Sequence, residues 1–387
     1  MSDRRLLLFN LLRGLAAILL ALAVATIFIF LSSDEPLTAL KYLLVGPVVS
    51  FKATGNVFNT VSFLTILAAM IPTIFSGLAV CVMFSANQFN LGGEGAIMLG
   101  GFVGALLGIY LHLNTGLHQV VCVLAGAIAG GLIMLIPAVL KVKLGASEMV
   151  TSLMMNYVVM FVILHFLNFV FADRTKGATQ TFPILETAKI PEIVANGTKL
   201  TWGFVVALVF VVIIALFMYR TKWGYAIRMI GINQSFAQYS GMQVGAVIIL
   251  SQVIGGLLSG MGGSIEVLGR YNTFLWRELP GYGWLGITIA ILAKNNPIFV
   301  PFAAFFIAYL NKGCDLMATY SDVPSEMIDI IQAAIFLFFA AEQFLAKYRQ
   351  KIVVRNAQRD LALQEAYADQ GDLALPNVAG SQGGSIS

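Results

Sequence analysis

Apolar runs of about 20 residues recur along almost the whole chain, and they constrain its fold more than any other feature. A helix of that length just crosses the hydrocarbon core of a bilayer, which is about 30 Å thick. The 387-residue sequence is 59% hydrophobic and only 11% charged, whereas a soluble domain carries about 25% charged residues. The sequence therefore predicts a polytopic membrane protein, an all-α bundle that needs a lipid bilayer around it.

We expect about ten transmembrane helices. Taken from the apolar runs, they lie near residues 11–31, 61–84, 93–112, 117–140, 149–171, 201–219, 244–264, 281–293, 297–312 and 327–346. The first run has no small-residue cleavage site behind a short core, so we interpret it as a retained anchor. With the N-terminus inside the cell, the basic clusters of the short loops fall on the cytoplasmic side, as the positive-inside tendency requires. Both termini are therefore predicted to be cytoplasmic.

Residues 1–346 are predicted to form one transmembrane domain, with two long outer loops near 32–60 and 172–200. The tail, residues 347–387, begins basic and then becomes rich in Gln, Ala, Asp, Gly and Ser, which predicts disorder. The net charge of +4 is the expected cytoplasmic excess of Lys and Arg, so it does not indicate nucleic-acid binding. The three cysteines show no metal-like spacing, and no metal site is expected.

Residues 220–242, here called the elbow, are too polar to cross a bilayer and too patterned for a slack linker. An apolar stripe at i, i+3, i+4 and i+7 predicts a short helix and is formed by Trp223, Ala226, Ile227 and Ile230. We expect Gly231 to interrupt this helix, Asn233 or Ser235 to cap a second helical turn, and Gly241 to end it. Basic residues assign the elbow to the cytoplasm: Arg220, Lys222 and Arg228. The alternative is an ordinary interfacial helix between two spans.

Polar side chains at membrane depth are costly and usually face a cavity or a partner. A Gly-rich break between the second and third spans carries Asn90 and Glu94. A broken helix frees backbone groups, so it is tolerated only where it lines water or is covered by protein. Glu148 opens the fifth span, and Asn156 lies about two turns further on.

Glu266 follows a glycine run at the end of the seventh span. Each carboxylate also has a purely local interpretation: Glu148 as a helix N-terminal cap, and Glu266 as an ion pair with Arg270 at i, i+4. The sequence contains 37 glycines, and patterns such as Gly256-Leu-Leu-Ser-Gly260 have the small-xxx-small spacing of tightly packed membrane helices.

Several of these stretches form an ordered set of motifs: Phe89-Asn-Leu-Gly-Gly-Glu-Gly95, Ser147-Glu-Met-Val-Thr-Ser-Leu-Met-Met-Asn-Tyr157, Thr221-Lys-Trp-Gly-Tyr225 with Gly231-Ile-Asn233, Ser259-Gly-Met-Gly-Gly-Ser-Ile-Glu-Val-Leu-Gly269, and Pro280-Gly-Tyr-Gly283 with Asn295-Asn-Pro297. They resemble the motifs of bacterial ABC importer permeases for nucleosides and simple sugars, the branched-chain-amino-acid-type permeases. The resemblance covers about residues 60 to 345. The chain length and the long 172–200 loop look most like the larger of two paired permeases of a nucleoside importer.

The resemblance implies a type II ABC importer-like fold in the bacterial cytoplasmic membrane, in which this chain forms one half of a pore. The implied partners are a cytoplasmic ABC ATPase that seats the elbow, a second and different permease chain, and an external substrate-binding lipoprotein. The chain has no Gly-x-x-x-x-Gly-Lys-Ser/Thr loop, so ATP and Mg²⁺ would bind the ATPase, and this chain is expected to be neither an enzyme nor a cofactor carrier.

The resemblance also assigns roles to residues. Those expected along or beside the pathway, where they contact solute or position the broken helices, are Asn90, Glu94, Glu148, Asn156 and Glu266. Those expected to couple the chain to the ATPase are Trp223, Gly224, Ile227, Arg228, Gly231, Asn233 and Gly241, with Trp223 and Ile227 as the anchors.

Two positions depart from the family pattern. Leu285 stands where an Asp is typical, and Ser147 where Asn is usual. If that Asp helps to bind or pass the substrate, the substrate or its route differs in this chain. A simple sugar such as a pentose is the alternative cargo to a nucleoside. A different class, an ion-coupled secondary transporter, would use Glu94 or Glu266 as the ion site. An intramembrane enzyme is disfavoured because the three histidines are scattered.

Overall fold

The computed structural model describes residues 26–30, 33–52, 55–175, 179–194 and 198–323, together with the single positions 23 and 333. Most of the first expected span, the last span at 327–346 and the tail at 347–387 lie outside the described residues. The orientation predicted for both termini is likewise untested by the structure.

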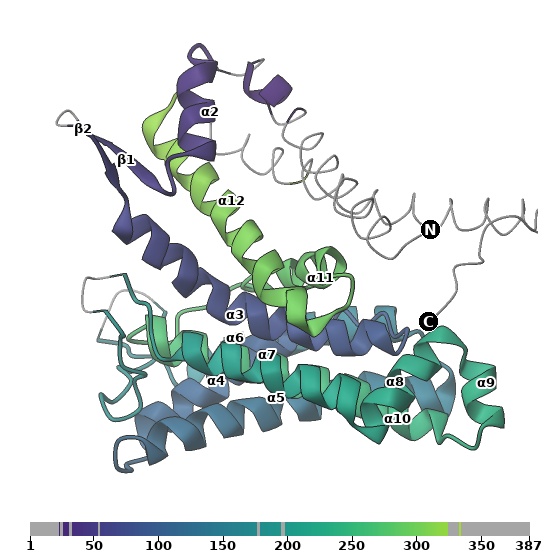
Figure 1. Cartoon of the computed structure of the whole chain (residues 1–387). Coiled ribbons are helices and arrows are strands. Elements are labelled where there is room, and N and C mark those ends of the chain that lie inside the picture. Colours follow the sequence, from purple (N-terminus) through teal and green to yellow (C-terminus); the bar gives the residue numbers. More distant parts are fainter. Residues whose placement is uncertain are drawn as a thin grey trace, which may run out of the picture.

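Within the described ranges, seven helical segments are long and apolar enough to cross a membrane (Figure 1). They are α3 (Thr60–Ser85), α4 (Gly93–Tyr110), α5 (Leu117–Leu144), α6 (Glu148–Phe169), α7 (Gly203–Arg220), α10 (Val244–Arg270), and η1 (Pro297–Phe299) continuing into α12 (Val300–Tyr320). The expected span at 281–293 is α11 (Tyr282–Leu292), which has 11 residues. At 1.5 Å per residue, α11 is about half as long as the bilayer core is thick.

Helix α10 lies at the centre of the bundle, against α3, α4 and α5. Glycines allow backbones to touch there: a Cβ atom at Gly260 would overlap the carbonyl oxygen of Gly126 in α5, and one at Gly263 would overlap that of Ile97 in α4. Ser264 adds a hydrogen bond from its hydroxyl to the Gly100 carbonyl oxygen, at 2.8 Å. The glycine pattern of the sequence therefore corresponds to a three-helix contact, as tight membrane packing predicts.

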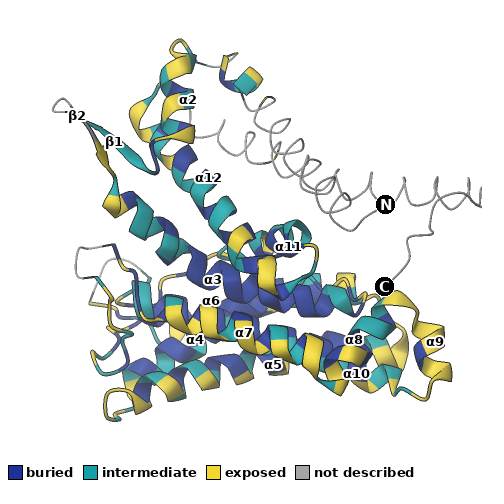
Figure 2. Ribbon diagram, in the orientation of Figure 1, coloured by how far each residue is buried: buried dark blue, intermediate teal, exposed yellow. Residues whose placement is uncertain are grey.

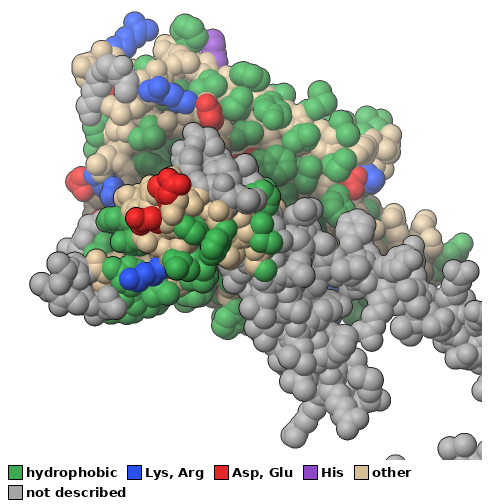
Figure 3. Space-filling view, turned by 90° about the horizontal axis from the view of Figure 1, so that it is seen from above, with side chains coloured by type: hydrophobic (Ala, Val, Ile, Leu, Met, Phe, Trp, Pro, Cys, Tyr) green, Lys and Arg blue, Asp and Glu red, His purple; other side chains and the backbone are tan. Residues whose placement is uncertain are grey.

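The outward faces of α5, α6 and α7 carry exposed apolar side chains (Figure 2). On α5 they recur about one turn apart, at Leu124, Ile128 and Leu132. In the space-filling view, hydrophobic side chains spread over the visible face and charged ones are few (Figure 3). By contrast α3 is buried along most of its length. An apolar exterior of this extent is what contact with lipid requires, because a soluble protein rarely exposes so large an apolar patch.

The segment expected as an outer loop near 32–60 is folded. It forms α2 (Pro36–Leu44) and an antiparallel hairpin of β1 (Val49–Lys52) and β2 (Gly55–Phe58), in which Val49 pairs with Phe58. Helix α2 packs against α12 through a small apolar cluster. Beyond the end of α12, the Asp322 carboxylate accepts hydrogen bonds from the Ser33 hydroxyl and the Asp34 N–H, which hold its pKa below the usual range.

The second loop, near 172–200, lies over the far end of α10 where it is described. Ile190 N–H donates to the Leu268 carbonyl oxygen at 3.1 Å, and Ile184 N–H donates to that of Asn272 at 2.8 Å. An isolated bridge also pairs Glu192 with Thr201 near the start of α7. These backbone contacts give the loop a defined path across the end of the bundle opposite the elbow.

The close contact of α10 with α4 predicts that Gly263→Ala destabilises the protein. The added methyl group must displace a backbone carbonyl, and overpacking of this kind costs about 1–3 kcal/mol. The matched control is Gly245→Ala in the same helix, whose Cβ would meet only the Val142 side chain. Thermal unfolding in detergent should show a lower Tm for the first variant alone; equal Tm values would contradict the contact.

Candidate functional site

The connection between α3 and α4 is held by the Asn90 side chain, which is fully buried. Its amide nitrogen donates to Gln252 Oε1 of α10 at 2.7 Å, and its Oδ1 accepts from Gly92 N–H at 2.8 Å. The next backbone N–H, that of Leu91, donates to Ser152 Oγ of α6 at 2.9 Å. Backbone groups freed by the break between helices are thus paired with side chains of α6 and α10, as burial in a membrane demands.

Asn156, in the third turn of α6, completes this arrangement. Its Oδ1 accepts from Gly95 N–H and its Nδ2 donates to the Leu91 carbonyl oxygen, both at 2.9 Å. An amide side chain is suited to this place because it offers an acceptor and a donor side by side. Asn156 therefore ties α6 to both sides of the break.

Glu94 lies in the first turn of α4 and is fully buried. Its carboxylate accepts hydrogen bonds from three N–H groups at the start of α11: Gly281 at 3.1 Å, Gly283 at 2.9 Å and Trp284 at 3.1 Å. The first N–H groups of a helix lack partners within the helix, and its N-terminus favours negative charge. One carboxylate thus lies at the N-termini of both α4 and α11.

Glu266, in the last turns of α10, contacts the same segment through a side chain. Its Oε1 accepts from the Tyr282 hydroxyl at 3.0 Å and pairs with Arg270 Nη1 at 3.2 Å. The ion pair at i, i+4 expected from the sequence is therefore present. Together Glu94 and Glu266 hold the start of α11 between α4 and α10.

Glu148 pairs with Lys141 at 2.8 Å, across the α5–α6 turn, and its carboxylate also interacts with the Phe89 backbone in the α3–α4 connection. The structure thus brings Asn90, Glu94 and Asn156 together at the α3–α4 break and links Glu266 to them through the start of α11. Their contacts are those of positioning residues. Direct contact of any of the five with solute stays a prediction.

Sequence reasoning missed several residues of the site. Gln252 is a buried amide in α10, and its presence within an apolar run was the available signal. Its Nε2 atom and the buried Ser76 and Ser259 hydroxyls have no hydrogen-bond partner in the described part of the chain. Leu285, where the motif resemblance led us to expect Asp, is half-buried and packs on the core directly after Trp284.

The ninth span was expected to end at Lys312, but α12 continues to Tyr320. This places Lys312 and Asp315 on a helix that is apolar over most of its length, and not in a loop. The signal was present in the sequence as the pattern of small and apolar residues after Gly313, which permits a helix to continue.

The elbow folds into α8 (Lys222–Ile232) and α9 (Gln234–Tyr239). The Thr221 hydroxyl caps α8 by accepting from Gly224 N–H at 3.1 Å, and Asn233 Oδ1 caps α9 by accepting from Phe236 N–H at 3.0 Å. Gly241 follows α9 with φ +79, a left-handed conformation that favours glycine. Of the two predicted capping candidates, Asn233 and not Ser235 therefore caps α9, and Gly241 terminates the elbow as predicted.

The apolar stripe of α8 packs against the main hydrophobic core of the bundle through three buried residues, Ala226, Ile227 and Ile230. Trp223 differs from the expected anchor: its side chain is 41% exposed, at the edge of the stripe. The buried side chains of Ile227 and Ile230 therefore anchor α8 to the bundle, whereas Trp223 remains partly exposed.

Gly231 does not interrupt the helix as expected, since α8 continues through it to Ile232. A Cβ atom there would overlap the carbonyl oxygen of Ser85, the last residue of α3, and one at Gly224 would overlap that of Phe217 in α7. Both positions thus require glycine, because the backbones of α3 and α7 approach α8 too closely for a side chain. Arg228 lies over the Tyr219 ring, at 5.1 Å from its centroid.

The outward face of the elbow carries apolar side chains without cover in the described chain. Ile232 is 79% exposed and Tyr239 is 92% exposed, and Phe236 lies between them along the chain, also exposed. Helices α8 and α9 lie at the end of the bundle where α3 finishes and α10 begins (Figure 1). Exposed apolar side chains of this kind are typical of surfaces at which proteins dock.

Residues 62–340 match the family model described as the branched-chain amino acid transport system / permease component. The chain belongs to this family. It is therefore a multi-pass membrane protein of the ABC transporter permeases, whose members are translocation subunits and not enzymes themselves.

Relatives with names that state a function match this permease over most of its length. It is 30% identical to the guanosine ABC transporter permease protein NupP of Bacillus subtilis, across 90% of this chain and 99% of the relative. It is 30% identical to the glucose ABC transporter permease protein TsgB13 of Haloferax volcanii, across 76% and 80%. The nucleoside ABC transporter permease protein NupB of Lactococcus lactis is 26% identical, across 86% and 90%. No solved structure matches the chain.

The contacts of Glu94 predict that Glu94→Gln destabilises the permease. The side-chain amide would turn an N–H group toward a backbone N–H donor of α11, and an unpaired buried group costs about 1–3 kcal/mol. The control is Glu186→Gln, because the Glu186 side chain is largely exposed and pairs only with Lys189 at the surface. The Tm of the purified protein should fall for Glu94→Gln and stay unchanged for the control; an unchanged Tm for both would exclude the capping role.

Proposed function

We propose that the chain is the membrane-spanning subunit of an ATP-driven importer and forms half of the pathway for nucleosides. The observation that carries this proposal is the elbow, a docked and glycine-fitted pair of helices with an uncovered apolar face. A permease that moved solute without a motor subunit would not need such a surface. The nucleoside cargo is supported by the names of relatives that match across nearly the whole chain.

The proposed coupling follows the contacts of the elbow. Its α8 touches the end of α3 at Gly231 and the end of α7 at Gly224, so a push on the elbow moves the ends of both helices. Directly after α3 comes the break held by Asn90, and after that Glu94, which holds α11. Movement at the elbow would therefore reach the start of α11 through packed groups, since interiors transmit strain.

The partners follow from this proposal. A cytoplasmic ABC ATPase, carrying ATP and Mg²⁺, would seat the elbow, and an external substrate-binding lipoprotein would deliver the solute. The second half of the pore would be a different permease chain: both NupP and NupQ of Bacillus subtilis, two guanosine ABC transporter permease proteins, match this sequence. The proposal includes about ten spans, both termini in the cytoplasm, a type II ABC importer-like arrangement and the bacterial cytoplasmic membrane.

A simple sugar is the second candidate cargo, and the glucose permease relative is the observation that favours it. Leu285 bears on this choice because it replaces a family Asp next to Trp284, whose N–H binds Glu94. With Leu285 in this place, a solute near the start of α11 would lack the carboxylate that an Asp would offer to it.

We expect nucleoside uptake to require both this chain and its ATPase. The measurement is uptake of labelled guanosine and ribose into cells that carry or lack the chain, with the ATPase intact and then inactivated. Uptake of ribose alone would support an ATP-driven importer whose substrate is a simple sugar and not a nucleoside. Uptake that is unchanged when the ATPase is inactivated would contradict the proposal and favour ion coupling at Glu94 or Glu266.

Tyr239→Glu and Ile232→Glu are expected to reduce uptake and solute-stimulated ATP hydrolysis at least about tenfold, because each places a charge in a desolvated interface. Both side chains are exposed in the permease alone, so its Tm should not change. Ile232→Met keeps an apolar surface and is the matched control. Full uptake by both charged variants at normal expression would mean that the elbow is not the docking surface.

A further inference from the structure

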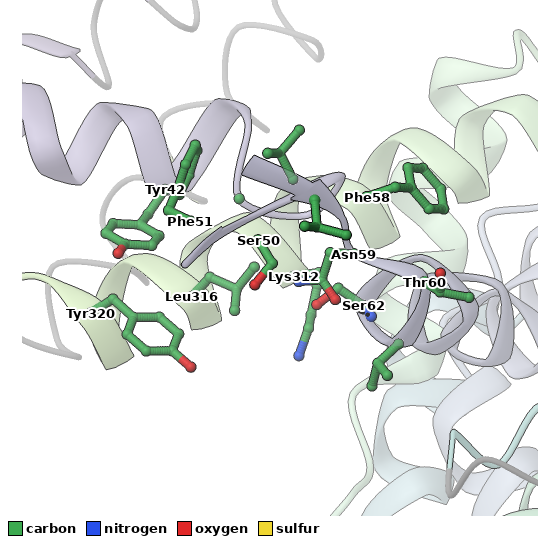
Figure 4. A pocket seen from close by; sticks show the side chains of 14 residues that line it. Tyr42, Ser50, Phe51, Phe58, Asn59, Thr60, Ser62, Lys312, Leu316 and Tyr320 are labelled. Carbon is green, nitrogen blue, oxygen red and sulfur yellow. Dashed lines mark hydrogen bonds between the residues drawn. The ribbon is translucent and has the colours of Figure 1, made fainter. Parts of the chain in front are cut away.

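A cavity of about 660 Å³ lies at the end of α3 opposite the elbow. Its walls come from α2, the β1–β2 hairpin, the first turn of α3 and the last turns of α12 (Figure 4). The first three segments follow one another along the chain, whereas α12 is distant in the sequence and meets them only in the folded chain. The volume falls within the range of about 300–1,000 Å³ that is typical of small-molecule sites.

One wall of the cavity is aromatic. The rings of Tyr42 and Tyr320 stack with centroids 5.2 Å apart and an interplanar angle of 19°, and Phe51 meets Tyr42 edge-on. Tyr320 is 59% exposed, so part of its ring stays uncovered by Tyr42. In Figure 4 the two tyrosines lie at one end of the cavity, beside Leu316. A supported, uncovered ring is a platform on which a planar heterocycle can stack.

The other wall is polar. Lys312 of α12 lies near Ser50 of the hairpin and Ser62 in the first turn of α3, and Thr60 also lines the cavity (Figure 4). Asn59 caps α3 by accepting from Ser62 N–H at 3.1 Å, which fixes the start of this helix. The helix N-terminus and the ammonium group make this wall a set of hydrogen-bond donors for carbonyl and hydroxyl oxygens.

Lys312 makes no direct hydrogen bond or ion pair among the described residues. No carboxylate there lies within ion-pair distance of its ammonium group, although Asp315 on the same helix is near enough to act on it through charge. A lysine on a largely apolar membrane helix is costly, and such residues usually face a cavity or a substrate path. Lys312 lines the cavity between α12, the hairpin and α3.

We propose that this cavity binds the transported solute on the outward side, and that it selects a solute carrying a planar heterocycle, such as a nucleoside. The base stacks on Tyr320, and its carbonyl oxygens or the ribose hydroxyls accept from Lys312 and exchange hydrogen bonds with the serine and threonine hydroxyls. A simple sugar fills only the polar wall. The assignment of the outward side rests on the proposed function, in which the elbow faces the cytoplasm.

The test measures the KM of guanosine uptake in cells expressing the full chain with its partners. Tyr320→Ala should raise the KM about tenfold, since base–aromatic stacking is worth about 1–3 kcal/mol. Tyr320→Phe keeps the ring and should recover most of the affinity, and Lys312→Met should also raise the KM. Phe302→Ala is the control, because this exposed residue lies on α12 but does not line the cavity.

Direct binding of guanosine to the purified full chain in nanodiscs separates the possible failures. If the wild-type chain supports guanosine uptake and Tyr320→Ala and Lys312→Met both keep its KM and binding, this site is excluded while the proposed function stands. If the wild-type chain supports ribose uptake and neither takes up nor binds guanosine, the nucleoside cargo fails and this inference fails with it. Normal expression and Tm of each variant exclude misfolding as the cause of a raised KM.

Discussion

The contact of α10 with α4 and α5 is the constraint on which the rest of the structure depends. Backbone carbonyls of Gly126 and Ile97 occupy the space where side chains of Gly260 and Gly263 would otherwise lie. In a bilayer, apolar surface alone gives helices little reason to associate, so close packing must supply the stability. Because α10 carries Gln252 on one turn and Glu266 on another, its position also determines where the polar groups of the site meet.

The buried polar groups then solve the problem that the broken helices create. The α3–α4 break and the start of α11 leave N–H and C=O groups without helical partners, and Asn90, Asn156 and Glu94 pair with them. These same contacts join the elbow end of α3 to α11. A network built in this way serves stability and mechanical coupling at once, since any movement of one helix end must shift the pairs that hold the next.

The candidate site could be predicted from the sequence in part. Asn90, Glu94, Asn156 and Glu266 were identified because polar residues beside glycines are unusual in apolar runs, and the Glu266–Arg270 pair follows from helical spacing. The partners of Glu94 could not be predicted, because they are backbone groups about 190 residues away along the chain. Gly231 was interpreted as a helix break for a similar reason: sequence alone does not show that Ser85 packs against it.

What the sequence by itself determined is the membrane-spanning, helical character of the chain, the position of most spans and the end of the elbow at Gly241, with Asn233 as one of two candidate caps. These depend on local hydropathy and on side chains that act within a few residues of their own position. Only the tertiary structure decided that α11 is short and held by Glu94, and that Lys312 joins Tyr42 and Tyr320 around one cavity. The physical reason is that such groups meet through packing between distant helices, and hydropathy carries no information about which helix faces come together.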